Sequence, residues 1–215
     1  MTAVCVNIIA KLVRRMAAMA VITFATATAA SAGWTPLPPW QQIEDIANRR
    51  CNSCHGGGGV GTNPLFPKLA GQNADYLFRQ MQNFRSGLRK GSVMYYQLSD
   101  LTTENVAALA KYYSVLPRLA AASGQSRLEA VGQEIFGRGI EDRHMPACAR
   151  CHGVDGRGSG VMPSLAAQHA GYISAQLRRF QEGTRVAGQT PEHPVADALT
   201  DDEILAVSLY IATLP

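Results

Sequence analysis

The sequence carries little charge and, beyond its first 32 residues, almost no excess of either sign. Only 17% of its 215 residues are charged, whereas 47% are hydrophobic. The first segment contains Lys11, Arg14 and Arg15, and 17 basic and 16 acidic residues remain after it. Nucleic acid is therefore a poor candidate partner, because duplex binding needs a concentrated basic footprint. The apolar content also excludes an unfolded tail, a collagen-like fibre and a disulfide-dense miniprotein.

Residues 33–215 also lack long apolar runs and the alternating pattern of strands. A membrane-spanning helix needs roughly 20 strongly apolar residues, and no segment there meets that length. The one apolar run covers about residues 16–30, follows the three basic residues and leads to Ala30-Ser31-Ala32. A basic start, a short apolar run and an A-x-A site are typical of a secretory signal peptide. We therefore predict that residues 1–32 are cleaved and that Cys5 is lost with them.

Four cysteines follow the predicted leader, and they form two copies of one motif. The copies are Cys51-Asn52-Ser53-Cys54-His55 and Cys148-Ala149-Arg150-Cys151-His152, both with the spacing C-x-x-C-H. Four cysteines in an exported protein usually form two disulfides, but this spacing is the attachment pattern of c-type haem. A zinc site would need both cysteine pairs to converge on one metal. A thioredoxin-like C-x-x-C would not need the histidine.

The chemistry of haem attachment explains the motif. The two thiols bond to the vinyl groups on one edge of the porphyrin, and the adjacent histidine supplies a nitrogen to iron. We therefore predict two covalently bound haem c groups. The predicted residues are Cys51, Cys54 and His55 for haem one, and Cys148, Cys151 and His152 for haem two.

The chain beyond the leader is a tandem repeat. Cys51 and His55 align with Cys148 and His152 at an offset of 97 residues. Further pairs align at offsets of 96 to 98 residues: Pro67 with Pro163, Leu69 with Leu165, Gln72 with Gln168, Tyr76 with Tyr172, Gln80 with Gln176, Phe84 with Phe180, Leu101 with Leu199 and Tyr112 with Tyr210. Self-similarity of this kind indicates a duplicated domain. We predict a first domain at residues 33–119 and a second at residues 120–215.

Each half is predicted to be helical, which gives an all-α fold. The expected helices cover residues 40–50, 73–87, 126–139 and 169–183, and two more begin after Thr102 and Thr200. Thr200 and Glu203 have the spacing of a capping box. The glycine-rich stretches 56–61 and 153–160 are interpreted as turns around the haem. Neither is a phosphate loop, because no Lys-Ser/Thr pair follows.

Together these motifs resemble the tandem di-haem class I cytochromes c of the cytochrome c4 family. The resemblance rests on C-x-x-C-H, on the Pro-x-Leu-Ala-x-Gln segment after it, on a Tyr-x3-Gln-x3-Phe-x2-Gly helix and on the Leu-Thr start of the last helix. It covers essentially all of residues 33–215. It implies two small helical cytochrome c domains, each wrapped around one covalent haem, and electron transfer in the bacterial periplasm.

The resemblance also implies a methionine as a second iron ligand, seven residues before the Leu-Ser/Thr pair. In the first half this position is Met94, seven residues before Leu101. Met94 is thus the expected second ligand of haem one. Four other residues are predicted to have packing, loop or helix-start roles without ligation: Met81, Met145, His144 and His169.

The second half departs from this pattern, because the matching position holds Glu192. The next residue, His193, lies 41 residues after its motif histidine, against 39 residues for the methionine of the first half. Three hypotheses remain for haem two: ligation by His193, an open or water-bound position, and a rearranged ligand such as Met162. Because His/Met ligation raises a haem potential, haem one should have the higher potential.

The sequence contains no further catalytic constellation, which favours an electron carrier. The expected partners are a donor, either a dehydrogenase or a quinol-oxidising complex, and a terminal oxidase or reductase, with any contact to the inner membrane made through them. Residues 33–119 carry nine basic and five acidic residues and residues 120–215 carry eight and eleven, which suggests two docking faces.

The alternative function is a di-haem oxidoreductase in which haem two oxidises a sulfur anion or reduces peroxide. Arg178, Arg179 and Arg185 are candidates to bind such an anion, although a solvated helix face explains them equally well. A third hypothesis is a haem-bearing subunit of a larger membrane complex.

Overall fold

A computed structural model of the protein describes residues 40–122, 126–185 and 194–215. Within these ranges the chain is helical, and its only strand-like feature is one isolated bridge between Ile140 and Met145. None of the described helices has the length and apolarity that crossing a membrane requires. The predicted leader, residues 1–32, lies outside the described residues.

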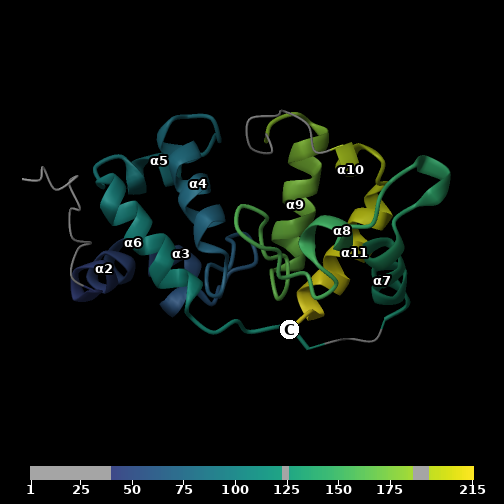
Figure 1. Cartoon of the computed structure of the whole chain (residues 1–215), viewed down its shortest axis with the longest axis horizontal. Coiled ribbons are helices and arrows are strands. Elements are labelled where there is room, and N and C mark those ends of the chain that lie inside the picture. Colours follow the sequence, from purple (N-terminus) through teal and green to yellow (C-terminus); the bar gives the residue numbers. More distant parts are fainter. Residues whose placement is uncertain (1–39, 123–125, 186–193) are drawn as a thin grey trace, which may run out of the picture. The chain divides into compact units, whose positions relative to one another are not determined.

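Among the described residues, the first half contains a short mixed helix followed by four α-helices and one 3-10 turn at Gly57–Gly59 (Figure 1). These are α2 (Trp40–Ile46), which continues as a π-helical turn (Ala47–Cys51), α3 (Asn52–His55), α4 (Ala74–Arg85), α5 (Ser92–Leu98) and α6 (Thr103–Ser114). Helix α6 packs against α2 and α4. The sequence predicted α2, α4 and α6 but not α5.

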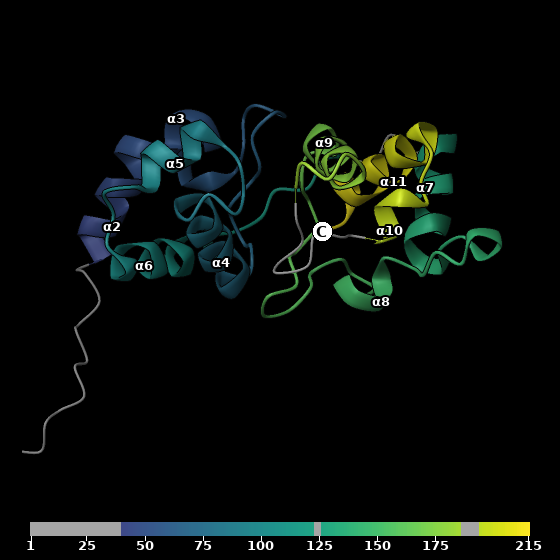
Figure 2. The same cartoon turned by 90° about the horizontal axis from the view of Figure 1, so that it is seen from above.

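The second half repeats this order. It contains α7 (Arg127–Arg138), α8 (Ala149–His152), α9 (Ala170–Gln181), α10 (Pro194–Asp197) and α11 (Asp201–Thr213). Helix α11 packs against α7 and α9, as α6 packs against α2 and α4. Figure 2 shows α2 to α6 gathered in one group and α7 to α11 in another. The predicted all-α fold in two repeated halves is confirmed for the described residues.

Side-chain caps fix where three of these helices begin. The hydroxyl of Thr102 accepts a hydrogen bond from the backbone N–H of Asn105, and Ser126 caps α7 in the same way. Thr200 and Glu203 form the capping box that the sequence predicted for α11. Caps of this kind stabilise a helix by roughly 1 kcal/mol each.

Each half has its own apolar core. In the first half, Ile43, Val106 and Leu109 are at most 1% exposed and join α2 to α6. In the second half, Phe136 and Ile204 occupy the corresponding place between α7 and α11. The apolar stripes that predicted the helices are therefore the faces that pack.

Helices α7 and α11 approach closely because Gly132 has no side chain. A Cβ at this position would lie 2.1 Å from the carbonyl oxygen of Ala206, so backbone would have to move. We expect Gly132→Ala to lower the free energy of unfolding by about 2–3 kcal/mol, the upper part of the range for overpacking. Gly137→Ala is the matched control on the same helix, since a Cβ added there would meet no atom of another element within 4 Å. Thermal unfolding should show destabilisation only for Gly132→Ala, and equal effects would contradict this packing.

Candidate functional site

The two C-x-x-C-H motifs form the same local structure. Cys51 ends the π-helical turn and His55 ends α3, while His152 ends α8. The chain then turns sharply at Gly56 (φ 77°, ψ 157°) and at Gly153 (φ 79°, ψ 157°). A side chain at these positive φ values would strain the backbone, so glycine allows the chain to leave directly after each histidine.

The ring of each motif histidine is held by a proline carbonyl. His55 Nδ1 lies 2.8 Å from the carbonyl oxygen of Pro67, and His152 Nδ1 lies 3.0 Å from that of Pro163. A carbonyl only accepts, so Nδ1 carries the proton and Nε2 keeps a free lone pair. Burial lowers the pKa of both histidines, which favours the neutral rings. Each ring is thus fixed in the tautomer that binds a metal through Nε2.

Backbone hydrogen bonds across the glycine-rich turns keep the proline carbonyls in place. In the first half, Gly61 N–H donates to the carbonyl of His55 and Leu69 N–H donates to that of Gly59, both at 2.8 Å. The second half repeats the pair, from Gly158 to His152 and from Leu165 to Gly156, both at 2.7 Å. In each half, the turn therefore positions the segment that carries Pro67 or Pro163 against the motif histidine.

The motif cysteines are free and chemically available. Cys51, Cys54, Cys148 and Cys151 form no disulfide. Burial raises the pKa of Cys51, and it raises the pKa of Cys148 to about 11, so both stay protonated at neutral pH. Over the described ranges, no three His, Cys, Asp or Glu side chains gather into a metal-binding group. Within that part of the chain, the cysteines and histidines of the two motifs therefore do not gather around one point.

A second repeated group of side chains joins the two halves. Arg89 donates to Gln80 of its own half at 2.8 Å and to Tyr172 of the other half at 2.9 Å. Arg185 mirrors it, donating to Gln176 of its own half and to Tyr76 of the first half, both at 2.8 Å. Each guanidinium also lies over a ring of its own half, Phe84 for Arg89 and Phe180 for Arg185.

These two arginines form no ion pair with an acidic side chain within the described part of the chain. Arg185 is only 8% exposed, and its Nε atom is buried without a hydrogen-bond partner. Burial acts to raise the pKa of Tyr172, but the positive charges of Arg89 and Arg185 outweigh it and lower that pKa. A buried cation without an anion is costly, so this region fits an anionic group that is not among the described residues.

The residues present fit haem c. Each half offers two free thiols, a histidine with Nε2 available and an arginine that has no acidic partner among the described residues. Haem c supplies two vinyl groups for the thiols, an iron for the histidine and two propionate carboxylates, one of which the arginine could pair with. The cysteines and histidines of the motifs would hold the ring and iron. Arg89 and Arg185 are the residues that would pair with carboxylates.

The described residues include four of the methionines that the sequence singled out. Met94 lies in α5, is half-buried and packs against the first core. Met81 packs against the same core from α4, and Met145 is 4% exposed in the second core, as a packing role requires. Met162 is 40% exposed. Glu192 and His193 lie outside the described residues.

Two histidines occupy the structural positions expected of them. His169 is the residue before the first turn of α9, where the sequence predicted a helix start. His144 is exposed and adopts a left-handed backbone (φ 52°) in the turn between Ile140 and Met145.

The structure separates two of the three arginines that the anion hypothesis grouped together, Arg178 and Arg185. Arg178 pairs with Asp201 at the surface, as an ordinary solvated residue does. Arg185 is buried between the halves and does not share that face. The sequence did hold a signal for the shared role of Arg89 and Arg185 between the halves. These two arginines align at the same offset of 96 residues as Tyr76 and Tyr172. That equivalence was missed because the arginines follow the helices instead of lying within the apolar stripe.

Both halves match known family models. Residues 130–215 match the family described as Cytochrome c, and residues 38–112 match the family described as Cytochrome C oxidase, cbb3-type, subunit III.

Relatives and a solved structure match most of the length of the chain. The chain is 36% identical over 168 residues to cytochrome c4 of Pseudomonas aeruginosa, covering 76% of this chain and 83% of the relative. It is 36% identical over 193 residues to a thiosulfate dehydrogenase electron acceptor of Thiomonas intermedia, covering 87% and 85%. It is also similar to the crystal structure of reduced cytochrome c4 from Pseudomonas stutzeri, with a TM-score of 0.77, 32% identity and coverage of 82% and 99%.

Proposed function

The chain belongs to the cytochrome c4 family of di-haem electron-transfer cytochromes, and from this premise we propose that it is a periplasmic electron carrier. It carries two covalently bound haem c groups. We propose a dehydrogenase or a quinol-oxidising complex as donor and a terminal oxidase or reductase as acceptor. The observation that supports this most strongly is the duplicated histidine site, in which each ring presents a free Nε2.

The proposal assigns a role to each motif residue. Cys51 and Cys54 attach haem one and Cys148 and Cys151 attach haem two, while His55 and His152 bind the irons. When bound, a haem iron takes up and gives up one electron, so two haems provide two redox centres in one chain. The proline carbonyls orient the histidines, and backbone hydrogen bonds across the glycine-rich turns hold those carbonyls in place. Met94 is the proposed second ligand of haem one.

The proposed ligand of haem two is His193. Met162 is less well placed, because the next residue, Pro163, bonds to Nδ1 of His152. Nε2, which would hold the iron, is the other nitrogen of the ring, so the carbonyl of Pro163 lies on the side of the ring away from it. The carbonyl of Met162 also accepts a hydrogen bond of 2.6 Å from Asn73 of the first half.

Replacing His193 by Ala is expected to make one haem high-spin and able to bind carbon monoxide, because the iron loses its sixth ligand. The wild-type ferric protein should be wholly low-spin, and electron paramagnetic resonance and carbon monoxide difference spectra measure both states. His144→Ala is the matched control, since His144 is an exposed histidine of the same half. A wild-type protein with one high-spin haem would remove His193 as ligand and favour the oxidoreductase alternative.

The proposed location and boundaries follow from the sequence. We propose a signal peptide at residues 1–32, a first domain at 33–119 and a second at 120–215. Intact-mass spectrometry of periplasmic material should give a chain starting at about Gly33 with two haems. A single haem, or haem that acid–acetone extracts, would contradict the assignment.

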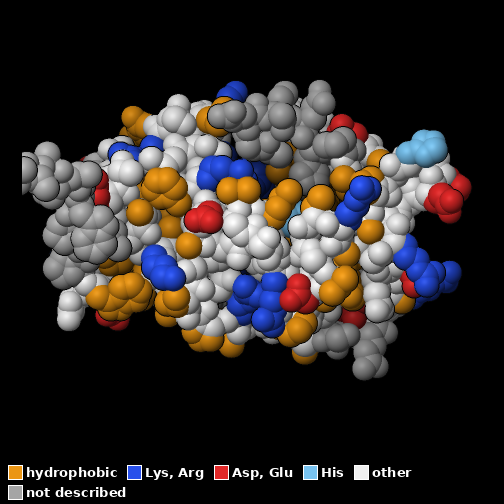
Figure 3. Space-filling model, in the orientation of Figure 1, with side chains coloured by type: hydrophobic (Ala, Val, Ile, Leu, Met, Phe, Trp, Pro, Cys, Tyr) orange, Lys and Arg blue, Asp and Glu red, His pale blue; other side chains and the backbone are white. Residues whose placement is uncertain are grey.

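The distribution of charge on the surface favours transient binding of partner proteins over a single extended basic interface. On the face shown in Figure 3, basic side chains form several separate groups with acidic side chains among them. Complementary charge of this kind accelerates encounter more than it deepens affinity.

A direct test separates the carrier from the oxidoreductase. Thiosulfate alone should leave the ferric protein oxidised, whereas thiosulfate with a thiosulfate dehydrogenase should reduce both haems; the dehydrogenase is chosen because it is the partner in the name of the Thiomonas intermedia relative. Reduction by thiosulfate alone would support the oxidoreductase. Failure of both this dehydrogenase and a quinol-oxidising complex to reduce the protein would contradict the carrier.

A further inference from the structure

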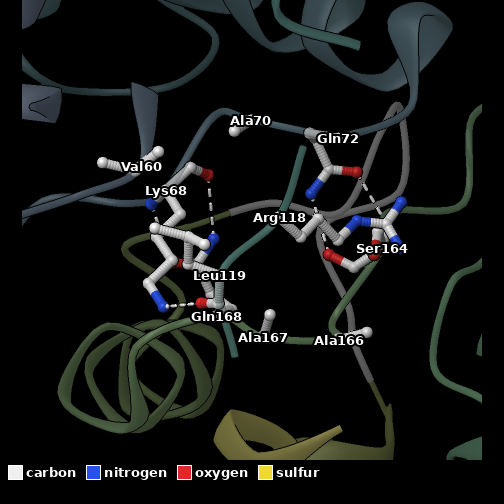
Figure 4. A pocket seen from close by; sticks show the side chains of 10 residues that line it. All are labelled: Val60, Lys68, Ala70, Gln72, Arg118, Leu119, Ser164, Ala166, Ala167 and Gln168. Atoms are coloured by element: carbon white, nitrogen blue, oxygen red, sulfur yellow. Dashed lines mark hydrogen bonds between the residues drawn. The ribbon is translucent and has the colours of Figure 1, made fainter. Parts of the chain in front are cut away.

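Two buried glutamines cross between the halves and bind the backbone of the opposite half (Figure 4). Gln168 Oε1 accepts from the N–H of Lys68 at 2.9 Å, and its Nε2 donates to the carbonyl of Lys68 at 3.0 Å. Gln72 binds Ser164 in the same way, at 2.7 and 2.8 Å. Gln72 is 7% exposed and Gln168 is 5% exposed. The repeat aligns the two glutamines with each other and Lys68 with Ser164.

The orientation of both amide groups is fixed by their partners. Besides the N–H of the opposite half, Gln168 Oε1 accepts from the N–H of His169 at 3.0 Å, and Gln72 Oε1 accepts from that of Asn73 at 2.9 Å. An atom that faces two N–H donors must be the oxygen, which settles the amide orientation.

Each glutamine holds the same peptide group that holds a motif histidine. The peptide between Pro67 and Lys68 accepts from His55 through its carbonyl and donates to Gln168 through its N–H. The peptide between Pro163 and Ser164 does the same between His152 and Gln72. A continuous chain of hydrogen bonds therefore runs from the histidine of one half to the glutamine of the other.

Hydrogen bonds in such a chain strengthen one another. When an amide N–H donates, the carbonyl oxygen of the same peptide group becomes more negative and accepts more strongly, by about 10–30% per bond in condensed phases. A stronger acceptor at Nδ1 makes the histidine a more basic iron ligand. A more basic ligand stabilises ferric over ferrous iron, so the glutamine should lower the potential.

We propose that Gln168 is a positioning residue that lowers the potential of haem one, and that Gln72 does the same for haem two. Each haem is thus tuned by a side chain of the opposite half. This inference rests on the proposed ligation of the irons by His55 and His152.

The test is the Gln168→Met variant of the full-length di-haem protein, compared with Gln72→Met. Methionine keeps the length of the side chain but removes the acceptor. Redox titration resolved by haem should show the ferrous-to-ferric ratio of haem one rising about threefold at fixed ambient potential in Gln168→Met, which is about 28 mV for one electron at 59 mV per tenfold. Gln72→Met should shift haem two alone. Proton NMR of the ferrous protein should show an upfield shift of the Nδ1 proton of His55 or His152, respectively.

Two further variants separate tuning from loosening of the contact between the halves. Arg79→Met removes a different bond between them, from Arg79 to the carbonyl of Val161 at 2.9 Å, and should shift neither haem. Gln168→Glu keeps an acceptor oxygen and should leave the potential of haem one at or below that of the wild type. It also serves as the test if Gln168→Met does not fold, since a raised haem-one potential in Gln168→Glu would overturn the inference.

Three results would overturn the inference: a shift of the haem in the same half, equal shifts of both haems, or none. Each of these results can be told apart from a failure of the proposed iron ligation. If His55 or His152 does not bind iron, the wild-type protein itself will lack the NMR signals of ligated histidine.

Discussion

Replacing Met94 by Ala is expected to remove the methionine–iron charge-transfer band and to lower the potential of one haem by on the order of 0.1 V or more, within the ~0.8 V that axial ligands span. The thioether stabilises ferrous iron, and water or no ligand would replace it. The other haem should keep its potential, because only the first half has a methionine at this position. Optical spectra and a redox titration measure both effects.

The matched control for this variant is Met81→Ala. Both methionines are half-buried and pack against the first core, Met81 from α4 and Met94 from α5. Each truncation should destabilise the protein by up to ~2 kcal/mol, the lower end for a methionine lost from a core. Only Met94→Ala should remove the band. A band that survives in Met94→Ala, or that disappears in Met81→Ala, would show that the assignment is wrong.

Replacing both Cys148 and Cys151 by Ser is expected to halve the covalent haem content. Without thiols the second half forms no thioether bond, so the haem that remains is the one bound to Cys51 and Cys54. Denaturing mass spectrometry should show the mass of one haem in place of two. The reciprocal double variant, Cys51→Ser with Cys54→Ser, should give the same stoichiometry.

The single variant Cys151→Ser keeps the test decisive if the double variant is degraded. The thioether to Cys148 should remain, so two haems stay covalently bound. The pyridine haemochrome spectrum should shift, because one vinyl group of haem two stays unsaturated. Cys5→Ser is the control, because Cys5 lies in the predicted leader. It should leave both haems and the spectrum unchanged. Two fully attached haems in the double variant would refute the motif assignment.

The sequence predicted the parts of the site that depend on neighbouring residues. The C-x-x-C-H spacing is local, and so are the caps at Thr102 and Thr200, which the structure confirms. Helix α5 was not predicted, because it has only seven residues and one buried side chain, Leu98. A single buried position in so short a segment produces no helical period.

The contacts between the halves could not be predicted in this way. Gln72 and Gln168 were visible as repeated positions, but their partners lie 92 and 100 residues away along the chain. Arg185 resembled a surface residue until its bond to Tyr76, 109 residues away, showed it to be buried. Periodicity and spacing describe one element at a time, so they contain no information on which repeated residues meet.

The measurement that tests the central proposal most directly is a spectroelectrochemical titration of the wild-type protein. A carrier with two differently ligated haems should take up two electrons per chain in two one-electron steps. The step at the higher potential should coincide with the change in the methionine–iron band, since His/Met ligation raises the potential. Uptake of one electron per chain, or a methionine band that belongs to the lower-potential step, would contradict the proposed sites.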